Sequence, residues 1–147
     1  MRRVLHVGPC DSPGGMATVM RTLADHPPEG WEATLLSSHS DGSLWAKWRA
    51  YRKAHRELSR QCTNDSERPN VVHVHVAADW SWRRKVRLVN VAKQHGVGVV
   101  VHLHSGRFDA WLDAGGARRL ETARTTLTSA GIQPVVLSEV WRERLEP

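Results

Sequence analysis

Short apolar runs alternate with longer amphipathic segments along the whole chain. The runs are rich in valine and leucine, and they predict five β-strands, at residues 2–7, 33–38, 71–77, 96–105 and 134–138. In the segments between and after them, apolar residues recur at spacings of three and four, as they do on one face of a helix. These segments predict helices at residues 16–25, 43–60, 80–95, 116–131 and 139–147.

This alternation of strands and helices predicts an α/β fold. We expect a single Rossmann-like, doubly wound, mainly parallel sheet with helices on both faces. The near-continuous valine runs support it, because a strand buried on both faces does not alternate polar and apolar residues. The 147 residues are enough for one domain with its own core. Ligands of such sheets bind beyond the carboxyl ends of the strands, so that edge is where site residues are expected.

Several polar or flexible positions follow the expected strands and would share that edge. Gly14 and Gly15 come after the first strand, His75 and His104 lie near the ends of the third and fourth, and Ser138 ends the fifth. The glycine pair directly precedes a helix, whose free backbone N–H groups favour a phosphate or another anion. The alternative is an ordinary flexible turn. The pattern is neither Gly-x-Gly-x-x-Gly nor a Walker loop, so neither NAD nor ATP is favoured.

Histidine occurs twice in the pattern His-x-His, as His73 with His75 and as His102 with His104. Residues two apart on a strand face the same side, so the members of each pair share a face. We expect no metal site, because no acidic or cysteine ligand accompanies the pairs at motif spacing. His73 and His102 are expected to be structural histidines with satisfied hydrogen bonds. For His75 and His104 that alternative stands beside a pocket role, in which a neutral imidazole contacts a sugar hydroxyl or a phosphate oxygen.

The chain is strongly basic, with a formal net charge of +6, which favours an anionic partner: nucleic acid, an acidic lipid surface or a phosphorylated substrate. The helix at 43–60 mixes cations with tryptophans, and its candidate membrane-contact residues are Trp45, Trp48, Arg49, Arg52 and Lys53. The alternative is a solvated outer face whose rings pack on the sheet. A second basic cluster follows the third strand and is either an anion-contacting group or a solvated helix start: Arg83, Arg84 and Lys85.

Cysteine usage and hydropathy suggest a compartment. Cys10 and Cys62 are isolated thiols, too few for a disulfide framework or a cysteine-based zinc site. No apolar run is long enough for a signal peptide or a membrane span. We therefore expect a cytoplasmic protein, with peripheral contact at the inner face of the membrane as an option.

The order of these pieces resembles the N-terminal, acceptor-side half of GT-B glycosyltransferases of the family-four type. The matching stretches come in family order and cover nearly all of the chain: "VLHVGP…PGGMATVMRTLA", "PNVVHVHVA", "RKVRLVNVAKQHGVGVVVHLHSGRFDAW" and "PVVLSEVWRERL". The resemblance implies transfer of a sugar from a nucleotide-sugar donor to a glycan or lipid-linked acceptor. No tightly bound cofactor is implied.

The resemblance also implies roles for individual residues. Gly14 and Gly15 would lie against the donor diphosphate, and His104 would be the catalytic residue pointing at the transferred sugar. His75 and the cluster Arg83–Lys85 would line the acceptor side. In that family a second Rossmann domain holds the nucleotide sugar with a Glu-x7-Glu pattern, which does not occur in these 147 residues. We therefore expect residues 1–147 to form the N-terminal domain, with the donor-binding half supplied by a second domain or a partner chain.

The alternative from another class is a non-catalytic basic domain that binds anionic surfaces or nucleic acid through its charge and its tryptophans. Binding that weakens steeply with salt and is indifferent to His104 would favour this alternative. Of the possible partners, nucleic acid is the one that we expect least.

Overall fold

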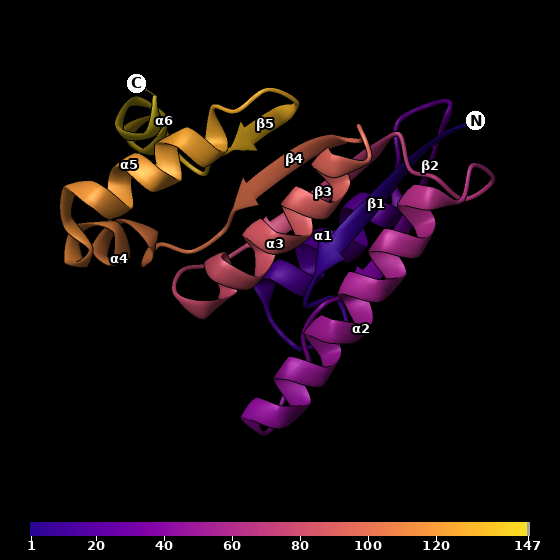
Figure 1. Ribbon diagram of the computed structural model, residues 1–147, viewed down its shortest axis with the longest axis horizontal. Helices are drawn as coiled ribbons and strands as arrows, with labels where there is room; N and C mark the ends of the chain where they lie inside the picture. Colours follow the sequence, from indigo (N-terminus) through magenta and orange to yellow (C-terminus); the bar gives the residue numbers. More distant parts are fainter. Residues whose placement is uncertain (147) are drawn as a thin grey trace.

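The computed structural model describes residues 1–146, and its centre is a five-stranded sheet in which every neighbouring pair of strands is parallel (Figure 1). The strands lie in the order β2-β1-β3-β4-β5. Along the chain they are β1 (Arg2–Gly8), β2 (Trp31–Ser37), β3 (Val71–Val76), β4 (Gly98–Leu103) and β5 (Ile132–Val135). The predicted class, an α/β fold with a Rossmann-like doubly wound sheet, is confirmed.

Helices connect the strands and follow the last one: α1 (Gly15–Asp25), α2 (Leu44–Thr63), α3 (Trp80–Gln94), α4 (Phe108–Ala114), α5 (Gly116–Leu127) and α6 (Glu139–Leu145). The chain runs outward from β1 to β2 through α1, then back past β1 to β3 through α2, and onward through α3 to β4. Right-handed crossovers in opposite directions place their helices on opposite faces of a sheet. Accordingly α1 covers one face, whereas α2 and α3 pack side by side on the other.

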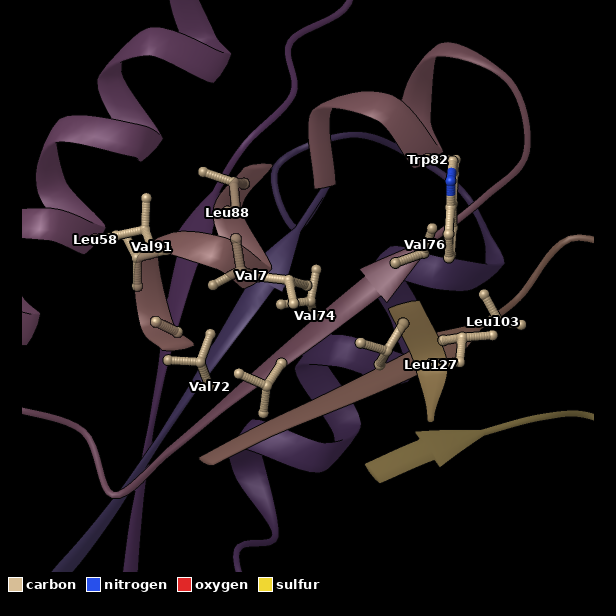
Figure 2. Close-up of a cluster of buried hydrophobic side chains, with 14 of the residues drawn as sticks. Val7, Leu58, Val72, Val74, Val76, Trp82, Leu88, Val91, Leu103 and Leu127 are labelled. Atoms are coloured by element: carbon tan, nitrogen blue, oxygen red, sulfur yellow. The ribbon is translucent and has the colours of Figure 1, made fainter. Parts of the chain in front are cut away.

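The face under α2 and α3 carries the main hydrophobic core. Inward-pointing valines of β1 and β3 meet Leu58 of α2 and Leu88 of α3, and all of these side chains are buried (Figure 2). Trp82 of α3 extends the core toward α4, where the centroid of the Phe108 ring lies 5.4 Å from that of Trp82. Burial of apolar surface, at roughly 25 cal/mol per Å², is the main force that holds these layers together.

The opposite face, under α1, carries polar side chains at its centre. Because side chains alternate along a strand, the residues between the inward valines point to this side, and they include histidines of β1, β3 and β4. Met20 of α1 is fully buried on this face, over Gly8. A Cβ atom placed on Gly8 would lie 2.5 Å from the Met20 sulfur and 3.2 Å from Cβ of His75. Glycine at this position therefore lets α1 approach the sheet beside the histidines.

Two features near the C-terminus differ from the sequence-based prediction. Strand β5 covers Ile132–Val135 rather than 134–138, so Ser138 does not end a strand. Its hydroxyl instead accepts a hydrogen bond from the Trp141 N–H at 3.4 Å and begins α6. The sequence pattern also misses α4, a seven-residue helix that is held by burial of Phe108 and Leu112 rather than by its own propensity. Pro147, which the prediction placed in the last helix, lies outside the described residues.

Candidate functional site

Histidines from β1, β3 and β4 gather on the face of the sheet that α1 partly covers. The sheet register pairs His6 with His73 and His75 with His102. His104 follows β4 directly, and its backbone N–H donates to the carbonyl of Val76 at 2.9 Å. The two predicted pairs therefore lie side by side on neighbouring strands. His6 is not predicted from the sequence, because a lone histidine inside an apolar run carries no signal of its own.

Three of these imidazoles form a continuous chain of contacts. Nδ1 of His6 lies 3.2 Å from Nε2 of His75, and Nδ1 of His75 lies 2.8 Å from Nε2 of His104. In each contact one nitrogen must carry the proton and donate, so the tautomers of the three rings are coupled. The chain runs from His6, which is buried, to His104, which is partly exposed at the carboxyl edge. His75, between them, is fully buried with both ring nitrogens engaged, so the prediction that His75 lines the acceptor side is wrong. Nδ1 is the ring nitrogen of His104 that this chain leaves free for other partners.

Burial keeps the histidines of this cluster in their neutral form. It lowers the pKa of His73 to about 3 and that of His104 to about 4, with neighbouring imidazoles adding to the effect. The pKa of His75 is lowered even further, first by burial and then by the surrounding histidines. Burial also lowers the pKa values of His6 and His102. Near neutral pH each ring therefore offers one N–H donor and one lone pair.

Two ring nitrogens of the cluster are buried without a hydrogen-bond partner among residues 1–146: Nε2 of His73 and Nδ1 of His102. Buried polar atoms are usually satisfied, because an unpaired one loses its hydrogen bonds to water without compensation. The expectation that His73 and His102 are structural histidines with satisfied hydrogen bonds is therefore wrong. The rings do stack on their neighbours, with centroid distances of 4.2 Å from His73 to His75 and 3.9 Å from His102 to His104.

A pocket of about 190 Å³ opens where three strands end. Pro9 follows β1, Ser38 follows β2 and Ala77 follows β3, and all three line it. The first turns of α3 close the pocket with Ser81, Arg84 and Lys85. Ala77 is joined to this helix start through its N–H, which donates to the Ser81 hydroxyl at 3.3 Å. This is the carboxyl edge of the sheet, where ligands of doubly wound folds bind.

Lys85 is the unusual group of this pocket, because its ammonium is buried without a carboxylate partner. Its side chain is only 5% exposed, and Nζ donates to the hydroxyl of Ser38. None of the ion pairs in the described part of the chain includes it. Burial lowers the pKa of Lys85 to about 7, and the positive charge of Arg84 adds to the shift. An anion in the pocket would therefore supply the counter-charge that the protein itself does not.

A second hollow of about 660 Å³ lies between α3, α4 and α5. Tryptophans with an arginine over each ring line it: the guanidinium of Arg83 lies 5.2 Å from the ring centroid of Trp80, and that of Arg119 lies 4.7 Å from Trp111. Asp79 stands at its rim with a φ of 59°, a conformation that is rare outside glycine. The predicted basic cluster is thus divided, with Arg83 in this hollow and Arg84 and Lys85 in the smaller pocket.

The glycine pair also lies at the carboxyl edge, where α1 begins. Gly14 has a φ of 137°, which favours glycine, and a Cβ atom on Gly14 or Gly15 would meet no heavy atom within 4 Å. The backbone here is therefore open to a ligand. Strands β1 and β4 are separated only by β3, so the ends of β1 and β4 lie about 10 Å apart across the sheet. The topology thus puts the glycine pair and His104 on the same edge.

The exposed end of α2 carries the predicted tryptophan and arginine surface. Trp45 and Trp48 stack with a centroid distance of 4.8 Å and are 59% and 47% exposed. The guanidinium groups of Arg49 and Arg52 lie over these rings, at 5.5 and 5.4 Å from their centroids. Both rings are therefore largely exposed, and Trp48 also lines a hollow beside Leu36 and Ser37 of β2. None of the helices in residues 1–146 combines the length and the apolarity that crossing a bilayer requires.

Neither a protein-family model nor a curated protein matches the chain. The molecule is therefore assigned by its structure, as an α/β protein with a five-stranded, all-parallel, Rossmann-like sheet. Its candidate site comprises the carboxyl-edge pocket with Lys85, the Trp80 and Trp111 hollow, and the histidine cluster.

Proposed function

We propose that this chain is the acceptor-side half of a glycosyltransferase, which moves a sugar from a nucleotide-sugar donor to a glycan or lipid-linked acceptor. The observation that carries the proposal is the pocket at the carboxyl ends of β1, β2 and β3, which holds a buried, unpaired Lys85. Its neighbour Arg84 adds a second cation. A diphosphate is a ligand of the matching charge, and Rossmann-like sheets bind ligands at this edge.

The donor phosphates would lie between this pocket and the start of α1. Gly14 and Gly15 leave room there for close approach, and the free N–H groups of the first turn of α1 favour an anion. As the sugar is transferred, the bond between the sugar and the diphosphate breaks and negative charge grows on the departing diphosphate. Fixed cations aimed at that charge stabilise the transition state. Lys85 and Arg84 would contribute, and a second domain or a partner chain would supply the remaining donor contacts.

His104 would act on the sugar side of the same edge. Its Nε2 is engaged by Nδ1 of His75, so its Nδ1 is left to contact substrate. When the Nδ1–H of His75 donates a hydrogen bond to Nε2 of His104, the neutral His104 ring carries its own proton on Nδ1. That N–H can then donate to a sugar hydroxyl or a phosphate oxygen. His75 is then a positioning residue that fixes the tautomer of His104. Its full burial holds the ring in place.

The acceptor would enter the hollow lined by Trp80 and Trp111. The rings of Trp80 and Trp111 offer flat apolar faces beside polar edges, and arginines surround them. That combination suits a sugar chain with acidic groups, or the phosphate-bearing end of a lipid-linked acceptor. Arg83 would contact the acceptor, whereas Arg84 and Lys85 would face the donor.

Peripheral binding to an anionic membrane is favoured by a separate observation, the exposed tryptophan pair on α2. Leu44, Trp45 and Trp48 are 85%, 59% and 47% exposed, and arginines lie beside the rings. Exposed aromatic rings with neighbouring cations suit the interface between lipid headgroups and acyl chains. Such contact would hold the protein at the inner face of a membrane, next to a lipid-linked acceptor.

The test is a hydrolysis and transfer assay with a panel of labelled nucleotide sugars, run with the chain alone and with candidate partner chains. We expect transfer only in the presence of a partner that supplies a donor-binding domain, and a loss of about 100-fold or more in His104→Ala. Full transfer by the isolated chain would refute the half-enzyme proposal. Salt-sensitive binding of polyanions that is the same in wild type and His104→Ala, without transfer, would favour the non-catalytic alternative.

A further inference from the structure

We propose that His6, His73 and His75 bind a divalent transition-metal ion, with Zn²⁺ as the expected occupant. Each residue offers one ring nitrogen, and these nitrogens all lie within 4.8 Å of one another. The three residues come from the adjacent strands β1 and β3, so their spacing is fixed by the sheet. The proposal goes beyond the sugar-transfer function and does not rest on it, and it departs from the sequence-based expectation of no metal.

The distances suit a metal ion with tetrahedral ligands. Nδ1 of His6 and Nε2 of His75 lie 3.2 Å apart. Two nitrogens bound to one Zn²⁺ at 2.0–2.1 Å in tetrahedral geometry are separated by about 3.3 Å. The contact is thus already close to the edge of a coordination tetrahedron. The ligand nitrogen of His73 lies within 4.8 Å of the other two and would have to move closer to complete a set of three.

The unpartnered nitrogen of His73 is the second observation that points to a ligand. Its Nε2 is buried and has no hydrogen-bond partner among residues 1–146. Burying a nitrogen lone pair in such a position is costly unless a hydrogen-bond donor or a metal ion binds it. Coordination to a metal ion satisfies the atom and explains why a strand that is otherwise apolar carries histidine here.

The contact between His75 and His104 resembles the hydrogen bond that orients a metal-binding histidine. A histidine that binds metal through one ring nitrogen usually donates the other N–H to a neighbouring acceptor. With Nε2 of His75 on the metal, its Nδ1 must carry the proton, and this atom lies 2.8 Å from Nε2 of His104. A bound metal would therefore fix the tautomer of His104 as well, with the proton on its Nδ1.

The donor set indicates which ion is bound. All of the ligands are neutral imidazoles, which suit Zn²⁺, Cu²⁺ and Ni²⁺ and do not suit Mg²⁺ or Ca²⁺, which prefer oxygen. Burial keeps the rings unprotonated, as metal binding requires. Three protein ligands leave a fourth position for water or an anion. A second set, His75, His102 and His104, meets the same distance limit, but its 2.8 Å contact is shorter than the edge of a zinc tetrahedron.

The experiment measures Zn²⁺ affinity by competition with a chromophoric chelator, using tag-free protein stripped of metal. His73→Ala removes one ligand but leaves the contacts among His6, His75 and His104, and His102→Ala is the matched control from the other set. We expect one Zn²⁺ per chain, an affinity loss of more than about 100-fold in His73→Ala, and a loss of less than about 5-fold in His102→Ala. Equal affinities of wild type and His73→Ala overturn the proposal. A larger loss in His102→Ala than in His73→Ala overturns the assignment to this set.

A measurement on the wild type alone guards against a variant that fails to fold. X-ray absorption of the zinc-loaded chain should show three imidazole ligands at about 2.0–2.1 Å. Nitrogen NMR of the histidine side chains should show the proton of His75 on Nδ1 once zinc is bound. A zinc ion with fewer than two imidazole ligands, or side-chain signals that do not change on addition of Zn²⁺, overturns the proposal.

Discussion

Replacing Lys85 by methionine should stabilise the folded protein while it abolishes anion binding. Lowering the pKa of a lysine from 10.5 to about 7 corresponds to a cost of about 5 kcal/mol for holding the ammonium in the pocket, at about 1.4 kcal/mol for each pKa unit. Methionine has a similar length and carries no charge, so it removes this cost. The Ser38 hydroxyl loses its partner, which costs about 1–2 kcal/mol. At pH 7 we therefore expect Lys85→Met to raise the free energy of unfolding by about 3 kcal/mol.

The effect has a defined pH dependence. Between about pH 7 and pH 10.5 the unfolded chain holds a proton on Lys85 that the folded chain has released. Stability of the wild type must therefore rise with pH across this window, and it must be lowest at and below pH 7. In Lys85→Met this contribution is missing. Other groups that titrate in the window are common to both proteins, so the difference between the two isolates Lys85.

The assay is urea unfolding of both proteins at several pH values from 6 to 10, with and without pyrophosphate as the probe anion. The stability advantage of Lys85→Met should shrink as the pH rises toward 10. Below pH 7 pyrophosphate should stabilise the wild type and leave the variant unchanged, because the anion binds the charged amine. If Lys85→Met is less stable than wild type at pH 7, or if the two proteins respond to pH in parallel, the reasoning about the buried cation is refuted.

Three further variants test other parts of the structure. Gly8→Ala places a Cβ atom 2.5 Å from the sulfur of the fully buried Met20. Urea titrations should therefore show a free energy of unfolding that is lower by about 1–3 kcal/mol. Unchanged stability would show that α1 does not pack closely there. Phe108→Ala removes a ring that is 1% exposed, and calorimetry should show that the free energy of unfolding falls by about 3–5 kcal/mol. A fall of less than about 1 kcal/mol would mean that α4 is not part of the core. Replacing both Trp45 and Trp48 by alanine should reduce binding to anionic vesicles in a sedimentation assay by about 10-fold or more. The melting temperature should stay unchanged. Vesicle binding equal to that of wild type would exclude a membrane role for α2.

The hydrophobic pattern is enough to predict the fold class, because β3 and β4 are rich in valine, with one face fully buried and the histidine-bearing face partly covered. Their valine runs, together with the regular return of amphipathic segments, are by themselves typical of a parallel sheet. The prediction is wrong where tertiary contacts determine whether an element forms and where it ends. Helix α4 is stabilised by Phe108 and Leu112 packing into the core, and β5 is an edge strand whose extent is set by its pairing with β4.

The candidate site is predictable only in part. The carboxyl-edge rule predicts the edge of the sheet at which His104, Gly14 and Gly15 lie. It cannot show that Lys85 is buried, since a lysine among other basic residues is expected to be solvated. It also cannot bring His6 to His75, because the register of two strands separated by about 70 residues depends on the whole fold.

The proposed anion site at the carboxyl edge is tested by following the backbone amide signals of the chain by NMR while a nucleoside diphosphate is added. We expect saturable shifts at Ser38, Ala77, Ser81 and Arg84, which line the carboxyl-edge pocket, and the loss of those shifts in Lys85→Met. Shifts confined to the tryptophan end of α2, or shifts that persist unchanged in Lys85→Met, would contradict the proposed anion site.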